Sequence, residues 1–333
     1  MNGSDPVLVT GATGFVGRAV AGALAARGER LRLLVRRGGN RRNLAGLGAA
    51  DLVEGDLCDP ASLARATAGC RQIYHVAADY RLWVPDPAAM LETNVGGTRA
   101  LMQAARAQGV ERIVYTSSVA ALGLTLDGSA ADESTPLDPA TLIGPYKRSK
   151  YLAEQAVREA AAHGLPVVIV NPSSPIGPGD IKPTPTGRII LDAARGRMPA
   201  YVDTGLNVVH VDDVAAGHLA AADHARIGER YILGGENLSL GVLLRMIAEA
   251  AGRKPPRFRL PIAPLYPLAL ATEVFARLSG QAPALTRDTL AMARKKMFYS
   301  SAKAEAELGY RARPVSEAIC DALAWFRAEG MLR

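Results

Sequence analysis

Three glycines spaced three residues apart constrain the fold of this chain more than any other feature. Gly11, Gly14 and Gly17 lie in VTGATGFVGRAV, directly after the apolar run 7–10 and at the start of a helical pattern. Glycines in such a turn let the backbone approach a pyrophosphate, while the helix N-terminus offers free N–H groups and a positive dipole end. The stretch predicts a dinucleotide-binding strand–turn–helix unit, with a plain glycine-rich turn as the alternative.

The first half of the chain repeats this alternation of apolar runs and helical stretches. The predicted strands are 31–36, 50–56, 72–78, 112–118 and 166–172, and long helices are predicted over about 88–108 and 146–163. Strands that alternate with helices are typical of a parallel sheet covered on both faces. We therefore predict an α/β fold with a Rossmann-type, doubly wound parallel sheet.

The pattern changes after Asn171. The stretch 171–187 contains five prolines, which favours an ordered loop over a site. Further strands are predicted at 207–213 and 228–233, and helices at 239–252, 264–278 and 315–328. We predict a dinucleotide-binding domain formed by 1–171 plus about 207–234, and a smaller, partly interleaved C-terminal substrate-binding domain formed by 172–206 and 235–333.

Composition narrows the range of partners. The 333 residues carry a net charge of +7, but the arginines are scattered and aromatic residues make up only 5%, so no basic run interleaved with stacking aromatics predicts nucleic-acid binding. Small-molecule substrates and anionic ligands such as phosphates fit this charge better.

His210, His218 and His224 lie near aspartates, but the sequence around them is typical of a strand end and an alanine-rich helix. We therefore expect no metal site and a structural role for His210.

Cysteine usage and the N-terminus predict a cytoplasmic protein. Cys58, Cys70 and Cys320 have no CxxC spacing and cannot all pair, which fits a reducing compartment, and residues 1–10 do not have the pattern of a signal peptide. The apolar stretch 260–272 is too short to span a membrane and contains three prolines. We expect it to pack on its own domain, with peripheral membrane contact as the alternative.

Charge at the end of the second predicted strand bears on which dinucleotide is bound. NAD-binding proteins place an acid about twenty residues after the glycine turn, whereas this chain has Arg36 and Arg37 there, with Arg41 and Arg42 nearby. Guanidinium groups can hold a 2′-phosphate that a carboxylate would repel. We predict a preference for NADP(H), with NAD(H) as the alternative cofactor and solvated arginines as the alternative interpretation.

A tyrosine and a lysine four residues apart lie at the start of the predicted helix 146–163. Tyr146 and Lys150 would share a helix face, with their Cβ atoms roughly 5–6 Å apart. An ammonium group near a phenol favours the phenolate, which brings a pKa near 10 closer to the range in which a tyrosine can act as an acid or base.

Motifs along the chain resemble the extended short-chain dehydrogenase/reductases, the superfamily of NAD-dependent epimerases, dehydratases and dihydroflavonol-reductase-like enzymes. The resemblance covers nearly the whole chain and rests on TGATGFVG at 10–17, GDL at 55–57, HVAA at 75–78, NVGGT at 94–98, YTSS at 115–118, YKRSK at 146–150, NP at 171–172 and HVDD at 210–213. The stretches HVAADYRLW, YTSSVAALG, NPSSPIGPGDIKPTPTGRII and ARKKMFYSSAKAEAELGY resemble most closely the group named hopanoid-associated sugar epimerases.

The resemblance implies roles for individual residues. Tyr146 would be the acid-base, Lys150 would lower its pKa and bind the nicotinamide ribose, and Ser118 rather than Ser117 would bond the reacting oxygen. Asn94 would anchor a helix. The implied cofactor contacts, besides Tyr146 and Lys150, are Gly11, Thr13, Gly14, Phe15, Val16 and Gly17 at the phosphates, Arg36 and Arg37 at the 2′-phosphate, Asp56 and Leu57 at the adenine, Val76, Ala77 and Ala78 at the middle, Thr116, and Pro172, Ser173 and Ser174 at the nicotinamide.

Departures from the family's sugar-nucleotide epimerases favour a different substrate. Where those enzymes place a diphosphate-binding arginine before the HV.D motif, this chain has Leu206 beside Asn207, although Arg294, Lys295 and Lys296 could substitute for a later arginine. We therefore expect a carbonyl reductase or alcohol dehydrogenase acting on a fairly apolar compound, with Tyr80, Trp83 and 260–278 as pocket walls. An epimerase working through a transient ketone and a non-catalytic dinucleotide sensor are the alternatives.

Relatives commonly form homodimers through the two long helices, and we expect the same here.

Overall fold

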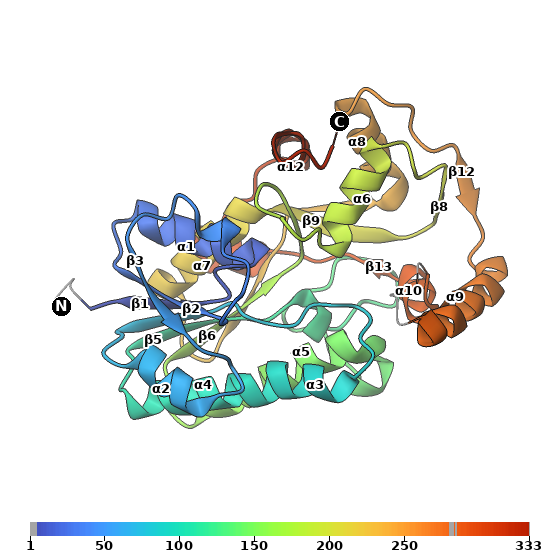
Figure 1. The fold of residues 1–333 in the computed structure, drawn as a ribbon. Coiled ribbons are helices and arrows are strands. Elements are labelled where there is room, and N and C mark those ends of the chain that lie inside the picture. The colour runs from blue at the N-terminus through green and yellow to red at the C-terminus, as the bar shows by residue number, and fades with distance from the viewer. Residues whose placement is uncertain (1–4, 280–282, 284, 333) are drawn as a thin grey trace.

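The structure, a computed structural model, describes residues 5–279, 283 and 285–332 (Figure 1). Its centre is a seven-stranded sheet in which every pairing is parallel. The strand order β3-β2-β1-β4-β5-β6-β10 is that of a Rossmann fold with one more strand at its edge, which confirms the predicted fold class. The strands are β1 (Val7–Thr10), β2 (Leu31–Val35), β3 (Ala50–Glu54), β4 (Gln72–His75), β5 (Arg112–Thr116), β6 (Val167–Pro172) and β10 (Arg230–Leu233).

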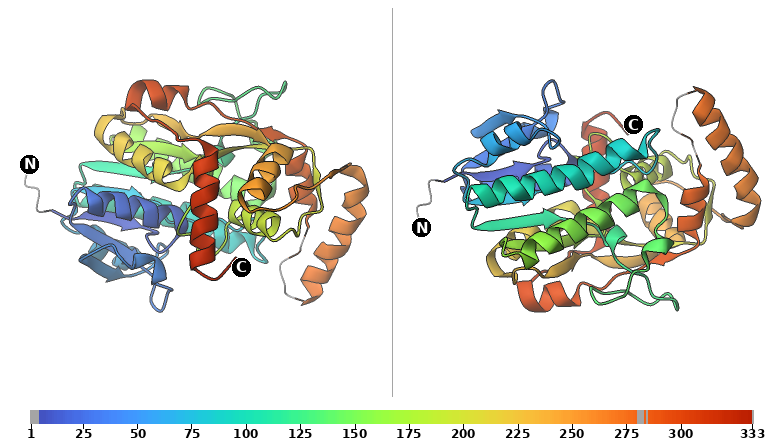
Figure 2. Two further views of the ribbon diagram at one scale, coloured as in Figure 1. Left: turned by 90° about the horizontal axis from the view of Figure 1, so that it is seen from above. Right: turned by 90° about the horizontal axis from the view of Figure 1, so that it is seen from below.

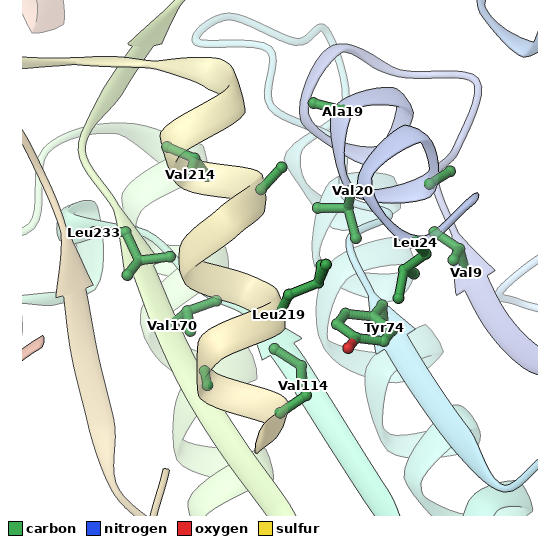
Figure 3. Packing of buried hydrophobic residues seen from close by; sticks show 14 of the residues in the cluster. Val9, Ala19, Val20, Leu24, Tyr74, Val114, Val170, Val214, Leu219 and Leu233 are labelled. Atoms are coloured by element: carbon green, nitrogen blue, oxygen red, sulfur yellow. The ribbon is translucent and has the colours of Figure 1, made fainter. Parts of the chain in front are cut away.

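Helices cover both faces of this sheet, as Figures 1 and 2 show. One face carries α1 (Phe15–Ala26), α7 (Val211–His224) and α11 (Ala302–Leu308), and the other carries α2 (Pro60–Thr67), α4 (Gly97–Ala107) and α5 (Gly144–Ala162). Alternate strand residues face opposite ways, so that Val114 packs with the first group of helices and Ile113 with the second. Figure 3 shows Leu24 of α1 and Leu219 of α7 packed over Tyr74 and Val114.

The helix predicted at 88–108 is interrupted. It consists of α3 (Pro87–Leu91), a π-helical turn η2 (Glu92–Gly96) and α4, and Asn94 lies in the π turn. Short π turns inside helices occur frequently at functional sites. Short 3₁₀ turns also occur in the described part of the chain, among them η1 (Arg42–Leu44), η3 (Val119–Ala121) and η4 (Pro139–Thr141).

A second, smaller part of the protein contains two small sheets. Strand β9 (Gly205–His210) pairs with β7 (Ser174–Ile176), β11 (Glu236–Ser239) and β13 (Lys296–Met297), and β8 (Ala200–Val202) pairs with β12 (Phe258–Leu260). Helices α6 (Pro185–Ala194), α8 (Leu240–Ala250) and α12 (Val315–Ala328) pack on this part around a core of their own.

The two strands predicted at 207–213 and 228–233 belong to different sheets. The first is β9 of the smaller sheet and the second is β10 of the large sheet. The helix between them, α7, packs on the large sheet against α1. The predicted boundary at 207 therefore falls inside β9, while the division into two domains stays a prediction.

The proline-rich stretch 171–187 is more ordered than a loop. It contains the short strand β7 and the start of α6, where Pro185 occupies the first turn and the Thr184 hydroxyl accepts a hydrogen bond from Gly187 N at 3.1 Å. Proline is tolerated in a first helical turn because its missing N–H would be unpaired there in any case.

The remaining helices lie at one end of the molecule. These are η5 (Ala263–Leu265), α9 (Tyr266–Ser279) and α10 (Arg287–Ala293), and Figure 2 shows α9 at the periphery, away from the large sheet. The predicted helix 264–278 is thereby confirmed.

Candidate functional site

The glycine turn between β1 and α1 is as tightly packed as the sequence predicts. Gly11 has a φ of 78°, and a Cβ there would lie 2.7 Å from the backbone nitrogen of Ala77. A Cβ at Gly17 would lie 2.1 Å from the Gly11 carbonyl oxygen. Residue Gly14 begins α1 without any side chain capping the helix, so the first N–H groups remain free for an anion.

This turn faces the point where the strand order of the sheet reverses. Strands β1 and β4 are neighbours, but α1 and α4, which follow them, lie on opposite faces of the sheet. Ligands of open α/β sheets bind in the crevice that such a reversal leaves at the carboxyl ends of the strands. The structure brings the glycine turn and Val76–Ala78 together there, with Ala77 N donating to Thr10 Oγ1 at 3.2 Å.

A buried asparagine that the sequence analysis missed holds the backbone of the glycine turn through hydrogen bonds. Asn43 of η1 donates its amide hydrogens to the carbonyl oxygens of Thr13 at 3.3 Å, Gly14 at 3.4 Å and Gly179 at 3.0 Å. It thereby joins the glycine turn to the middle of the proline-rich stretch. An isolated asparagine in a polar loop gave no signal in the sequence, because its three partners come from distant segments.

The ends of β2 and β3 hold the residues predicted to meet the adenosine part of a cofactor. Arg36 and Arg37 are exposed directly after β2, whereas Arg41 pairs with Glu54 at 2.5 Å and Arg42 with Glu329 at 2.6 Å. Within the described part of the chain, no ion pair involves Arg36 or Arg37.

Asp56 and Leu57, which follow β3, lie at the same end of the crevice as the arginines after β2. Asp56 is half-buried and its carboxylate accepts a hydrogen bond from Cys58 N at 2.9 Å, while Leu57 is buried against Gly97. Both lie at the carboxyl end of the sheet.

Ser118 and Tyr146 come together from separate elements. Ser118 follows β5, and Tyr146 lies in the first turn of α5, where burial raises the pKa of its phenol and the nearby Ser118 hydroxyl acts in the opposite direction. The neighbouring Ser117 hydroxyl instead donates to the buried Glu154 carboxylate at 2.5 Å. Ser118 is therefore the serine of this run whose hydroxyl meets the phenol.

Lys150 is buried on α5 with two hydrogen-bond partners. Its ammonium donates to the carbonyl oxygen of Thr116 at 2.8 Å and to the Tyr115 hydroxyl at 3.3 Å, and burial lowers its pKa to about 8 while Glu154 raises it. Burial also raises the pKa of the Tyr146 phenol, and the role expected of Lys150 in lowering that pKa stays a prediction.

The carboxyl end of β6 contributes an unpaired polar group. Ser173 has a buried hydroxyl without a hydrogen-bond partner among the described residues, and it lies between Pro172, which ends β6, and Ser174, which begins β7. An unpaired buried hydroxyl costs free energy unless a ligand satisfies it. With the glycine turn, whose backbone leaves no room for side chains, this residue fits a bound dinucleotide.

Thr116 is less suited to contact a dinucleotide through its side chain, because its hydroxyl bonds to His218 Nε2 at 2.8 Å on the α7 face.

Asn94 anchors the site, as predicted. Its side chain accepts a hydrogen bond from Asp79 N at 2.7 Å and donates to Ser149 Oγ at 2.9 Å, and Ser149 Oγ donates to the Tyr146 carbonyl oxygen at 2.8 Å. Thr98 Oγ1 in turn donates to the Asn94 carbonyl oxygen at 2.6 Å. The π turn is thus tied to the helix that carries Tyr146.

A cavity of about 470 Å³ adjoins Pro145, the residue before Tyr146. It is lined by Leu82, Trp83, Val84, Pro87, Pro145, Glu273, Thr286, Arg287 and Asp288. Trp83 is one wall of this cavity, whereas the Tyr80 hydroxyl donates to the Lys182 carbonyl oxygen at 3.4 Å outside its lining. Of the described residues in 260–278, Glu273 lines the cavity, and an apolar substrate wall from this segment stays a prediction.

Two polar residues at positions weighed for phosphate and metal binding, Asn207 and His210, have structural partners. Leu206 is buried, and Asn207 Nδ2 donates to Gly235 O at 3.0 Å and to Asn237 Oδ1 at 2.8 Å. His210 accepts from Asp212 N at 3.0 Å as the cap of α7, which confirms its predicted structural role. The described residues contain no cluster of His, Cys, Asp and Glu that could hold a metal, and none of the described helices has the length and apolarity needed to cross a membrane.

The fold and this crevice define a Rossmann-type dinucleotide-binding protein, and comparison with known proteins gives the family. Residues 7–234 match the model of the NAD-dependent epimerase/dehydratase family, so the chain belongs to that family and to the extended short-chain dehydrogenase/reductase superfamily. It is accordingly an NAD(P)-dependent oxidoreductase.

Individual relatives match along almost their whole length. A protein of Synechocystis sp. that bears a provisional dihydroflavonol 4-reductase name is 45% identical, with 99% of this chain and 97% of that protein covered. Sterol demethylase protein B of Methylococcus capsulatus is 37% identical, with 98% and 99% covered. The crystal structure of gox2253 is 58% identical, with a TM-score of 0.90 and coverage of 99% of this chain and 100% of that one.

Proposed function

We propose that this protein is an NADP(H)-dependent carbonyl reductase or alcohol dehydrogenase of the dihydroflavonol-reductase type, acting on a fairly apolar ketone, aldehyde or alcohol. The observation that carries the proposal is the placement of the Tyr146 phenol, from the start of α5, beside the Ser118 hydroxyl, which follows β5. The phenol keeps its proton at neutral pH and can give it to the oxygen of a carbonyl that receives a hydride.

Each residue of the site has a separate task in this proposal. Tyr146 gives the proton to the substrate oxygen in reduction or takes it in oxidation, and Ser118 donates a hydrogen bond that polarises the carbon–oxygen bond. The ammonium of Lys150 leaves its bonds to Tyr115 and Thr116 to hold the nicotinamide ribose and adds positive charge beside the phenol. The dinucleotide, when bound, supplies the hydride.

The residues for holding the dinucleotide follow from the crevice. The free N–H groups of α1 and the glycine turn would hold its phosphates, Asp56 and Leu57 its adenine, and Ser173 its nicotinamide amide. Arg36 and Arg37, which have no ion-pair partner among the described residues, would hold the 2′-phosphate and give the preference for NADP(H) over NAD(H).

The apolar character of the substrate is supported by two observations. The cavity beside Pro145 has Leu82, Trp83 and Val84 on one side, and Leu206 is buried where sugar-nucleotide epimerases place an arginine for the diphosphate. The names of two relatives point the same way. One bears a dihydroflavonol 4-reductase name and the other is named sterol demethylase protein B, and both names refer to compounds built on fused ring systems. A homodimer through α4 and α5, which lie side by side, is part of the proposal.

The proposal is tested with the variant Tyr146→Phe. Removing the hydroxyl deletes the proton donor and leaves the ring in place, so turnover of NADPH with a reducible apolar ketone should fall by about 10²–10⁴-fold. NADPH should still bind, as measured by fluorescence titration. Near-normal turnover in this variant would overturn the proposed mechanism, and a change of substrate configuration without net NADPH oxidation by the unmodified protein would favour an epimerase.

A further inference from the structure

Helix α9 presents an outward face on which the described side chains from Pro267 to Phe275 are apolar. Pro267, Leu268, Leu270, Ala271, Val274 and Phe275 are all exposed, and at 100° per residue they fall within one side of the helix. Phe275 is 64% exposed and Leu268 54%. A surface helix normally turns such residues inward, so this helix has the reverse of the usual arrangement.

The inner side of α9 is small and polar. Ala269 and Ala276 are the residues of this helix buried among the described side chains. Thr272 Oγ1 donates to the Leu285 carbonyl oxygen at 2.5 Å, and Glu273 accepts hydrogen bonds from the Arg287 backbone N–H at 2.7 Å and from its guanidinium group at 2.9 Å. These bonds fix the rotation of α9, so the apolar face cannot be turned inward without breaking them.

The chain that leads into α9 extends the same surface. In Figure 1, β12 and α9 follow one another along one edge of the molecule, and Phe258 and Leu260 of β12 are 68% and 40% exposed. Four exposed cations, Arg253, Lys254, Arg257 and Arg259, precede α9, and no acidic residue occurs from 250 to 272. Only Arg259 of these four is in an ion pair, with Asp203, within the described residues.

We infer that this surface, the α9 face, docks on an anionic lipid bilayer. An apolar helix face flanked by unpaired cations matches the acyl boundary and the headgroups of such a bilayer. A second copy of the chain fits less well, because a symmetric contact would bring the cations of both copies together.

Docking would place the cavity of the candidate site at the bilayer surface. Glu273 and Arg287, on the inner side of α9, both line that cavity, so the helix is the wall between the cavity and the α9 face. The inference concerns the surface alone and holds whichever reaction the site performs.

The experiment is sedimentation of the full chain with vesicles of phosphatidylcholine and phosphatidylglycerol, compared with phosphatidylcholine alone. We expect binding to the anionic vesicles that weakens with salt. The double variant Val274→Glu/Phe275→Glu should weaken it by about a hundredfold, and Lys254→Ala by about fivefold. Ile227→Glu is the matched control, because Ile227 is 55% exposed in the turn between α7 and β10. Figure 1 shows α7 well away from α9.

Each result decides the inference. Retained binding in Ile227→Glu and lost binding in the α9 variant support it, provided that NADPH titration and thermal unfolding show all variants folded. Absence of binding to anionic vesicles, or equal binding by all variants, overturns it. Light scattering that shows self-association through Val274 and Phe275 without vesicle binding also overturns it, in favour of a second copy. Ketone reduction by the unmodified protein tests the proposed function separately.

Discussion

Replacing Arg36 by alanine tests how this protein distinguishes its two dinucleotides. Arg36 is exposed after β2 and contributes to lowering the pKa of Asp79, which already holds Arg81 through both carboxylate oxygens. Its guanidinium group is therefore available to a phosphate. A charge-assisted hydrogen bond contributes roughly 1.5–3 kcal/mol when well shielded, and solvent exposure reduces this to about 1–2 kcal/mol.

That free energy corresponds to a loss of about 5–30-fold in kcat/KM for NADPH, because 1.4 kcal/mol is a factor of ten. The assay is the steady-state oxidation of NADPH and of NADH at a saturating concentration of an apolar ketone, with kcat/KM for NADH expected to stay within about twofold. Arg41→Ala is the matched control, because Arg41 lies in the same loop, carries the same charge and is paired with Glu54. Equal losses with both dinucleotides, or a wild-type protein that prefers NADH, would refute the reasoning.

Two further results are expected from the site. Asn43→Ala should raise the Kd for NADPH several-fold and lower Tm, because it leaves the carbonyl oxygens of Thr13, Gly14 and Gly179 without their shared donor; unchanged values in titration and thermal unfolding would contradict its supporting role. The ammonium of Lys150 is present below its pKa of about 8 and lost above it, so kcat/KM should fall as pH rises through about 8. Lys150→Arg should move this fall to higher pH, and a pH profile identical to that of the wild type would assign it to another group.

The features that the sequence predicted well are local. The glycine turn and the alternating strands follow from short-range patterns of glycine and apolar residues. The roles of Ser118, Tyr146 and Asn94 came instead from the resemblance to a known family, because the bonds of Asn94 to Asp79 and Ser149 join separate segments.

The features that sequence analysis could not give depend on distant partners. Strand β9 has the same apolar pattern as the strands of the large sheet, and only its pairing with β11 and β13 places it in the smaller one. The orientation of α9 was missed because an apolar stretch predicts burial, whereas Thr272 and Glu273 bind partners on the inner side and turn the large side chains outward. The partners of Lys150 likewise required coordinates.

The π turn at 92–96 makes the spacing of its helix functionally sensitive. Deleting a single residue there would turn the segment into a regular α-helix, a locally favourable change. It would also remove the local bulge in which Asn94 lies, so that Asn94 could no longer join Asp79 to Ser149. The shortened segment would form its helix more easily, but α5, which carries Tyr146, would lose its hydrogen bond to Asn94.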